Sequence, residues 1–147
     1  MNALEQDLRA RARQDEVASR LTTIPGIGAI CATAMEALAP SAAAFSKGRD
    51  FAACFGLTPK QNSSGGKERL GRTSKMGQRD LRRLLIIGAT TVVHWARRRG
   101  APAGTWLARM VLTPKLIAVA LANKLARIAW ALMARGGVYE APAPGPA

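Results

Sequence analysis

The chain has 147 residues and a mass of 15.6 kDa, which is the size of one ordinary domain. Lys and Arg number 22 against 9 Asp and Glu, and the resulting charge of +13 indicates a polyanionic partner, because self-repulsion of that size destabilises a small domain. Aromatic residues make up only 5% of the chain, which argues against base stacking on single strands as the main mode of binding.

The cysteines and the apolar runs exclude further classes. Cys31, Cys54 and the single His94 are too few for a structural zinc site, which takes four nitrogen or sulfur ligands. Both cysteines lie in apolar runs and are predicted to be buried free thiols. The N-terminus is charged and polar, so no signal peptide is expected. The most apolar stretch, residues 116–133, contains charged residues in its interior and does not predict a membrane span, so we expect a cytoplasmic protein.

The N-terminal region predicts one helix over residues 3–21, with a thin apolar stripe of Leu4, Leu8 and Val17. A helix with so few apolar residues rarely stands alone. Residues 1–20 are therefore predicted to be the end of a longer linker or coiled-coil helix.

Two short helices are predicted next. Residues 28–38 form a run of small residues that Pro40 ends. Ser41 is a candidate helix cap, and residues 49–55 predict the second short helix.

Residues 56–77 lack a helical period and are rich in Gly, Ser and cations, which predicts a long loop or a loose hairpin. A loop of this length inside a compact domain is usually functional. Helices are predicted over residues 78–97, 106–111 and 114–135, and residues 140–147 are predicted to be a disordered tail. The fold class is therefore mostly α, with five or six helices and one long basic Gly/Ser loop or loose hairpin.

The segment Thr-Ile-Pro-Gly-Ile-Gly, residues 23–28, resembles the turn of a helix-hairpin-helix motif, which we predict over residues 20–38. Gly26 and Gly28 allow a tight turn whose backbone N–H groups can hold a phosphate at the start of the following helix. Such a motif binds the duplex backbone without reading bases. A plain helical hairpin with a glycine turn is the alternative.

The basic segment from Lys47 to Arg83 carries ten cations and three acids, a net +7 of the total +13. Cations on a glycine-rich element are suited to holding phosphates, although a solvated face is an equally good explanation from composition alone. The predicted DNA contacts in this segment are Lys60, Lys67, Arg69, Arg72, Lys75, Arg79, Arg82 and Arg83.

The pair Ser63-Ser64 lies in the middle of the same segment. A hydroxyl among cations could attack a phosphodiester, but on composition alone Ser-Ser-Gly-Gly is more typical of a linker. His94 is better explained as a helix residue than as a general base. The nine acids are scattered, so no metal site or resident cofactor is predicted in this chain, and a metal-dependent nuclease is not supported.

Five ordered blocks of sequence resemble the C-terminal domain of the IS110/IS116/IS902 type of insertion-sequence transposases. The blocks are Ile-Pro-Gly-Ile-Gly (24–28), Phe-Ala-Ala-Cys-Phe-Gly-Leu-Thr-Pro (51–59), Ser-Ser-Gly-Gly-Lys (63–67), Leu-Gly-Arg-Thr-Ser-Lys-Met-Gly (70–77) with Leu-Arg-Arg-Leu-Leu (81–85), and residues 119–132 with Gly137 and Tyr139. The resemblance covers residues 10–139 and implies that residues 21–139 form this domain.

In that family the C-terminal domain supplies a nucleophilic serine that cleaves DNA through a transient covalent link. The resemblance places this serine at Ser64, which follows Pro59 and directly precedes Gly65, with Ser63 as the alternative. It also implies a homo-oligomer, a structured guide RNA as a further partner, and action on nucleoid DNA in the bacterial cytoplasm.

The family's other part is an N-terminal RuvC-like domain with a DEDD cluster for Mg²⁺. No such quartet is present here, so we expect a fragment or the product of a truncated element, unable to complete recombination alone. The alternatives are a non-catalytic helix-hairpin-helix module that binds the DNA backbone, and an RNA-binding, ribosome-associated basic protein.

Overall fold

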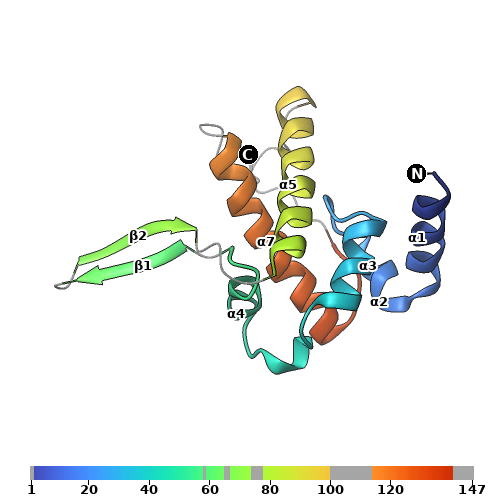
Figure 1. The fold of residues 1–147 in the computed structure, drawn as a ribbon, viewed down its shortest axis with the longest axis horizontal. Helices are drawn as coiled ribbons and strands as arrows, with labels where there is room; N and C mark the ends of the chain where they lie inside the picture. Colours follow the sequence, from blue (N-terminus) through green and yellow to red (C-terminus); the bar gives the residue numbers. More distant parts are fainter. Residues whose placement is uncertain (1, 58, 65–66, 74–77, 100–113, 141–147) are drawn as a thin grey trace.

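The computed structural model describes residues 2–57, 59–64, 67–73, 78–99 and 114–140. Helices dominate this part of the chain, so the mostly α fold class is confirmed (Figure 1). The elements are α1 (Asn2–Gln14), α2 (Glu16–Leu21), α3 (Ala29–Leu38), the 3-10 turn η1 (Ala42–Ala44), α4 (Gly48–Ala53), β1 (Pro59–Ser64), β2 (Lys67–Thr73), α5 (Arg79–Arg99) and α7 (Pro114–Arg135).

The prediction of one unbroken helix over residues 3–21 is wrong, because the helix is interrupted at Asp15. The Asp15 carboxylate accepts a hydrogen bond from the Ala18 N–H at 2.8 Å and so begins α2 as a new helix. A short acidic side chain competes for backbone N–H groups and favours helix ends over helix interiors. Both α1 and α2 pack against α3 and bury Ala12 and Ala18. The division of the chain at residue 20 stays a prediction.

The other helices lie close to their predicted positions. The helix predicted over residues 114–135 has the same bounds as α7, and Gly136 ends it in a left-handed conformation with φ +79°. Ser41 precedes η1, but its side chain makes no capping hydrogen bond. The helix predicted over residues 106–111 lies outside the described residues, as does the predicted tail except for Glu140, which is in neither helix nor strand.

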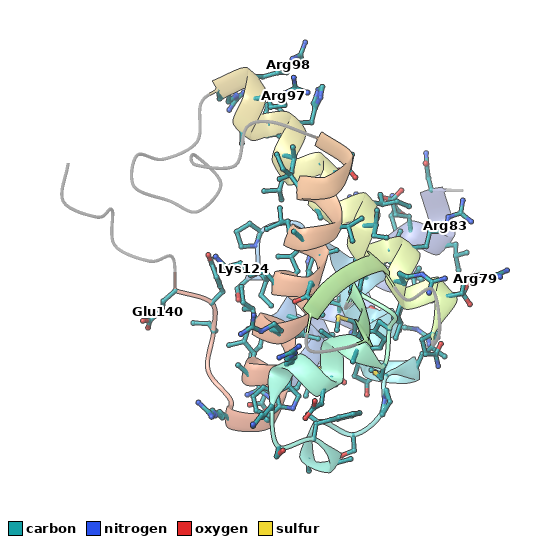
Figure 2. The ribbon with its side chains drawn as sticks, turned by 90° about the vertical axis from the view of Figure 1, so that its left-hand side faces the viewer. Arg79, Arg83, Arg97, Arg98, Lys124 and Glu140 are labelled. Atoms are coloured by element: carbon teal, nitrogen blue, oxygen red, sulfur yellow. The ribbon has the colours of Figure 1, made fainter. Side chains whose placement is uncertain are left out.

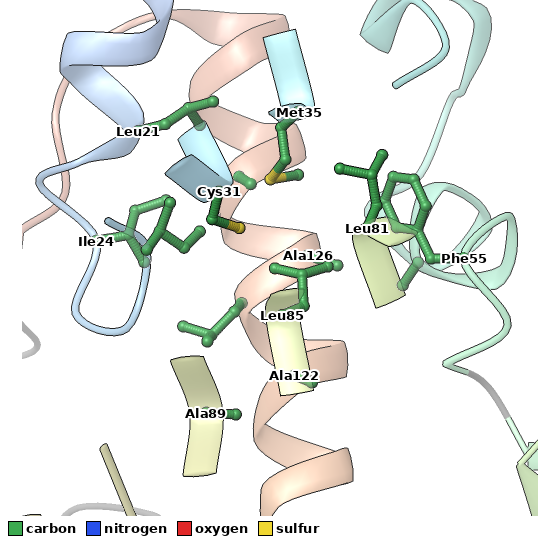
Figure 3. Close-up of a cluster of buried hydrophobic side chains, with 14 of the residues drawn as sticks. Leu21, Ile24, Cys31, Met35, Phe55, Leu81, Leu85, Ala89, Ala122 and Ala126 are labelled. Carbon is green, nitrogen blue, oxygen red and sulfur yellow. The ribbon is translucent and has the colours of Figure 1, made fainter. Parts of the chain in front are cut away.

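The core is built where α5 lies along α7 (Figures 1 and 3). Leu81, Leu85 and Ala89 of α5 are fully buried and come together with Ala122 and Ala126 of α7. The four-residue spacing places each set on one face of its helix. Because three of the five side chains are alanine, the two helices can approach closely.

The turn between α2 and α3 is pressed against α5 through a contact between two glycines. Gly26 has φ +93°, a conformation that favours glycine. A Cβ on Gly88 of α5 would overlap the Gly26 carbonyl oxygen, and a Cβ on Gly26 would lie 3.0 Å from Val92 Cγ2 and 3.2 Å from Leu125 Cδ1. A side chain at Gly88 would therefore require the backbone to move, and one at Gly26 would be strained by its positive φ.

Residues 59–64 and 67–73 form an antiparallel pair of strands, the hairpin, which projects from the helical body on the side opposite α1 (Figure 1). Pro59 pairs with Thr73, Gln61 with Leu70, and Ser64 with Lys67, with an irregularity in register between Pro59 and Gln61. Of the two alternatives predicted for residues 56–77, a long loop or a loose hairpin, the described strands match the hairpin.

Candidate nucleic-acid interface

The chain that leads into the hairpin is held to the helical body at Leu57. The Leu57 N–H donates to the Ala52 carbonyl at 3.3 Å, and the Gly56 N–H donates to the Ala53 carbonyl at 2.9 Å. This pair of bonds, with Gly56 at φ +69°, is the Schellman arrangement that ends a helix. The Leu57 carbonyl in turn accepts a hydrogen bond from Asn123 Nδ2 of α7 at 3.1 Å.

The chain that leads from the hairpin into α5 is held to the helical body at Gln78, directly before α5. Its backbone N–H donates to the Cys54 carbonyl at 3.3 Å, and its side-chain Nε2 donates to the Leu38 carbonyl at 3.3 Å. Gln78 and Asn123 are thus positioning residues that the sequence does not reveal. Their partners are backbone carbonyls 40 and 66 residues away, which leave no local pattern.

The predicted nucleophile lies at the far end of this anchored hairpin. Ser64 is the last residue of β1, and its Cα partner across the ladder is Lys67, the first residue of β2. Ser63 pairs with Glu68 instead. Because consecutive residues alternate between the two faces of a strand, Ser63 and Ser64 occupy opposite faces of the hairpin.

The predicted basic contacts divide between two elements. Lys60 lies on β1, and Lys67, Arg69 and Arg72 lie on β2, whereas Lys75 is outside the described residues. The remaining three, Arg79, Arg82 and Arg83, begin α5 beside the base of the hairpin. Arg79 and Arg83 are exposed, while Arg82 is half-buried and its Nη1 has no hydrogen-bond partner within the described part of the chain. Seven of the eight predicted cations in this segment thus lie on the hairpin or in the first turns of α5.

The two glycines of the predicted phosphate-binding turn differ in their surroundings. Gly26 is held against α5, as described above, so its lack of a side chain has a structural cause. Gly28 is exposed, precedes the first residue of α3, and has no atom within 4 Å of the position a Cβ would take. Ile24 and Ile27 are buried and fix the turn to the core. The start of α3 is therefore open to solvent at Gly28.

The other nucleophilic and basic side chains are poorly suited to catalysis. Both cysteines are free; burial raises the pKa of Cys31 to about 11, and partial burial also raises the pKa of Cys54. Cys31 is buried as predicted, and Cys54 is only half-buried. A thiol with a raised pKa is a weak nucleophile at neutral pH because little thiolate forms. His94 lies exposed on α5.

Two properties of the described residues concern metal binding and membrane insertion. Within those residues, no three His, Cys, Asp or Glu side chains lie together in a way that could hold a metal ion. One helix, Ile117–Arg135 in α7, is long and apolar enough to cross a membrane by length and composition alone. In this fold its apolar face packs inside the helical body, where Ala122, Leu125 and Ala126 are buried.

A comparison with known protein families shows which family the chain is related to. The model of the IS116/IS110/IS902 transposase family matches residues 18–102, which include the end of α2, α3 to α5 and the hairpin. The chain belongs to this transposase family. The resemblance of the five sequence blocks is thereby confirmed at the level of the family.

Curated relatives agree with this membership of the transposase family. A Sinorhizobium fredii protein described as transposase y4pF/y4sB is 45% identical over 143 residues, which are 95% of this chain and 37% of the relative. A Pseudomonas aeruginosa protein described as a family 20 transposase is 44% identical over 139 residues, 93% of this chain and 41% of the relative. The transposase for insertion sequence element IS1328 of Yersinia enterocolitica is 38% identical over 139 residues, 93% of this chain and 42% of the relative. The chain thus spans about two fifths of the length of these transposases.

Proposed function

We propose that this chain is the DNA-binding and strand-transfer domain of a transposase, with Ser64 as the nucleophile that attacks a DNA phosphodiester. The observation that carries the proposal is the position of Ser64 at the far end of β1, on a hairpin anchored at both bases. Lys67 is its partner across the ladder, and three further cations lie on the two strands. Cations beside a phosphate stabilise the charge that develops during its transfer.

In the proposed step, the Ser64 hydroxyl gives up its proton and its Oγ forms a bond to phosphorus. The bond between phosphorus and one deoxyribose oxygen breaks, and that oxygen leaves as a hydroxyl after taking up a proton. The strand is then held to the protein by a phosphodiester that includes Ser64, so no external energy is needed to rejoin it. Attack by the hydroxyl of another strand completes the exchange and frees Ser64.

The metal requirement of such a reaction belongs to another part of the transposase. The described residues of this chain offer no group of acidic side chains that fits Mg²⁺. We propose that a RuvC-like domain with four acidic residues holds Mg²⁺, which would polarise the scissile phosphate. The present chain supplies the nucleophile and its cationic surroundings.

The test of this step uses a chimera, in which this chain replaces the matching 37% of the Sinorhizobium fredii relative. Labelled duplexes carrying the ends of the element are incubated with the chimera, and covalent protein–DNA adducts are separated under denaturing conditions. The expected result is an adduct that Ser64→Ala abolishes and Ser63→Ala leaves in place. Peptide mapping should find the nucleotide on Ser64.

Ser63→Ala is the matched control, because it makes the same change one residue away on the opposite face of β1. Binding of the duplex should stay within about twofold in both variants, since neither removes a cation. An adduct that survives both substitutions would show that the nucleophile is elsewhere.

A second function is favoured by the exposed start of α3. We propose that the turn over residues 22–28 acts as a helix-hairpin-helix that binds the DNA backbone at Gly28, and this binding could occur without catalysis. The open space at Gly28 leaves room for a phosphate to approach the first N–H groups of α3, where the helix dipole favours an anion.

Substitution at Gly28 separates this binding role from folding. Gly28→Asp should keep or slightly raise the melting temperature, because aspartate is a good helix cap. It should weaken duplex binding about tenfold, since a charge-assisted hydrogen bond contributes on the order of 1.5 kcal/mol. The uncharged cap in Gly28→Ser should bind DNA nearly as well as Gly28. Equal binding by all three chains would exclude a phosphate at this turn.

The remaining partners follow from the transposase role. We propose that the whole transposase acts as a homo-oligomer, with a structured guide RNA, on nucleoid DNA in the bacterial cytoplasm. The charge of +13 is suited to both nucleic acids. A preference for structured RNA over duplex DNA at equal salt would favour the ribosome-associated alternative, although an RNA-guided transposase also binds RNA.

A further inference from the structure

The solvent face of α5 carries a strip of cations that the hairpin does not include. The buried residues Leu81, Leu85, Ala89 and Val93 repeat every four positions and face the core. The opposite face is exposed, and we call its polar residues the α5 strip. These residues are the cations Arg79, Arg83, Arg97 and Arg98, the uncharged Thr90, Thr91 and His94, and one acid, Asp80.

The strip is long and straight because it lies on one continuous helix. Arg79 and Arg98 are separated by nineteen helical residues, which correspond to about 28 Å at 1.5 Å per residue. Figure 2 shows Arg79 and Arg83 near one end of the helix and Arg97 and Arg98 at the other, with their side chains directed into solvent. This length corresponds to about eight base-pair steps along the axis of a duplex, at roughly 3.4 Å each.

The charges of α5 are not explained by contacts within the described part of the chain. The helix carries six arginines and only one acid, Asp80. Arg97–Arg99 suit the negative end of the helix dipole, but Arg79 and Arg83 stand at the positive end, where a cation is destabilising. Among the described residues, neither Arg79 and Arg83 nor Arg97 and Arg98 form an ion pair. An anionic partner would offset this repulsion.

We propose that the α5 strip binds the sugar–phosphate backbone of a duplex nucleic acid along the length of the helix. The inference rests on the proposed DNA-binding role and adds a third contact, beyond the hairpin and the turn at Gly28. The cations at both ends of the strip contact phosphates, and the uncharged middle around Thr90 passes beside the backbone. The same phosphate chemistry is offered by duplex DNA and by duplex RNA, which the experiment separates.

A second copy of this chain is a poorer occupant of the same face. Ile87 lies in the middle of the strip and is 52% exposed, as expected for part of a protein interface. A symmetric dimer through this face would, however, bring two sets of arginines together, because a two-fold interface uses the same patch from both subunits. Like charges at such close range are strongly unfavourable.

The test removes the cations at the far end of the strip, where no other predicted contact lies. The double variant Arg97→Gln/Arg98→Gln of the full chain is titrated with labelled duplexes of DNA and of RNA at several salt concentrations. The expected result is a loss of affinity of about tenfold or more at low salt. The slope of log K against log salt should fall by about 1.8, at roughly 0.9 per phosphate contact. The duplex that shows this change identifies the natural ligand.

Two control variants make the result specific. Arg9→Gln/Arg13→Gln makes the same change in net charge on exposed residues of α1 and should alter the salt slope by far less. Arg97→Lys/Arg98→Lys keeps both charges and should restore binding, which distinguishes phosphate contact from loss of packing.

Three outcomes would contradict binding by the α5 strip, and each leaves the proposed function to be tested separately. An equal change in the α1 and α5 variants would show only long-range attraction. An unchanged slope in the α5 variant, with normal binding by the native chain, would exclude the strip while DNA binding by the hairpin stands. A shift from dimer to monomer in sedimentation, without loss of DNA affinity, would assign the face to a second copy. The Ser64 adduct is measured in a separate assay, so its absence would not change the interpretation of these binding titrations.

Discussion

The hairpin and the helical body of this transposase domain are stabilised in different ways. The body buries apolar side chains from every helix that the structure describes, and α5 contacts the turn before α3 where Gly88 meets Gly26. The hairpin consists of two strands that pair with each other and project from the body. A two-stranded hairpin is marginally stable alone in water, so its position depends on the anchors at Leu57 and Gln78. Residues proposed to do chemistry thus lie where substitution barely affects folding.

The largest expected effect is on the body, at Gly88. Gly88→Val places a side chain into the Gly26 carbonyl and should lower the free energy of unfolding by about 3 kcal/mol or more, measured by urea unfolding. Gly28→Ser is the matched control, because the space around Gly28 is open, and should change stability by less than about 0.5 kcal/mol. Equal losses at the two glycines would mean that the turn does not press on α5.

Removal of the hairpin should have the opposite effect, with little change in stability and a large loss of duplex affinity. Replacing residues 60–72 by a short glycine linker should leave the melting temperature within about 3 °C, because the buried core is untouched. Duplex affinity should fall about a hundredfold at low salt, since four described cations are lost. Calorimetry and binding anisotropy measure the two effects. Cooperative loss of the body on excision would show that the hairpin is part of the core.

Burial in the body should also be visible as a pH dependence at Cys31. Its pKa is about 11 in the folded chain against an ordinary 9.0, so its contribution to stability is complete below pH 9 and is lost as the pH rises towards 11. At pH 10 the loss is about 1.4 kcal/mol, the equivalent of one pKa unit. Cys31→Ala should remove this part of the pH slope in urea unfolding. An unchanged slope would mean that the thiol is not desolvated.

The smallest expected effect on stability is at the anchor between body and hairpin. Asn123→Ala removes the hydrogen bond to the Leu57 carbonyl and should cost about 1 kcal/mol in unfolding experiments. The rate of adduct formation at Ser64 should fall more than this stability loss predicts, because one base of the hairpin is released. Asn2→Ala, which makes the same change at an exposed position of α1, is the control and should leave the adduct rate nearly unchanged. Equal effects on rate would contradict a positioning role for Asn123.

Several features of the fold could be read from local sequence. α7 has its predicted bounds because Pro114 suits a helix start and Gly136 suits a helix end. Asp15 was a readable signal as well, since an acid three residues before an N–H can cap a helix, yet the apolar stripe on both sides predicted one helix. A continuous apolar period therefore does not guarantee a continuous helix.

The candidate site was only partly predictable. Composition pointed to the cations, and family resemblance pointed to Ser64, but neither could show that β1 and β2 pair with Ser64 opposite Lys67. Pairing register depends on which residues meet across the ladder, and a Gly/Ser-rich polar segment specifies that register weakly.

The sequence by itself determined the mostly helical class, most helix ends and the family, because each is recorded in residues that are near neighbours in the chain. Only the tertiary structure decided that Gly26 packs on Gly88 and that Asn123 and Gln78 hold the two bases of the hairpin. These contacts join backbone groups from distant parts of the chain. Every residue has a backbone carbonyl, and a glycine does not show by itself what packs on it. The partners in these contacts are therefore set by the packing of the helices.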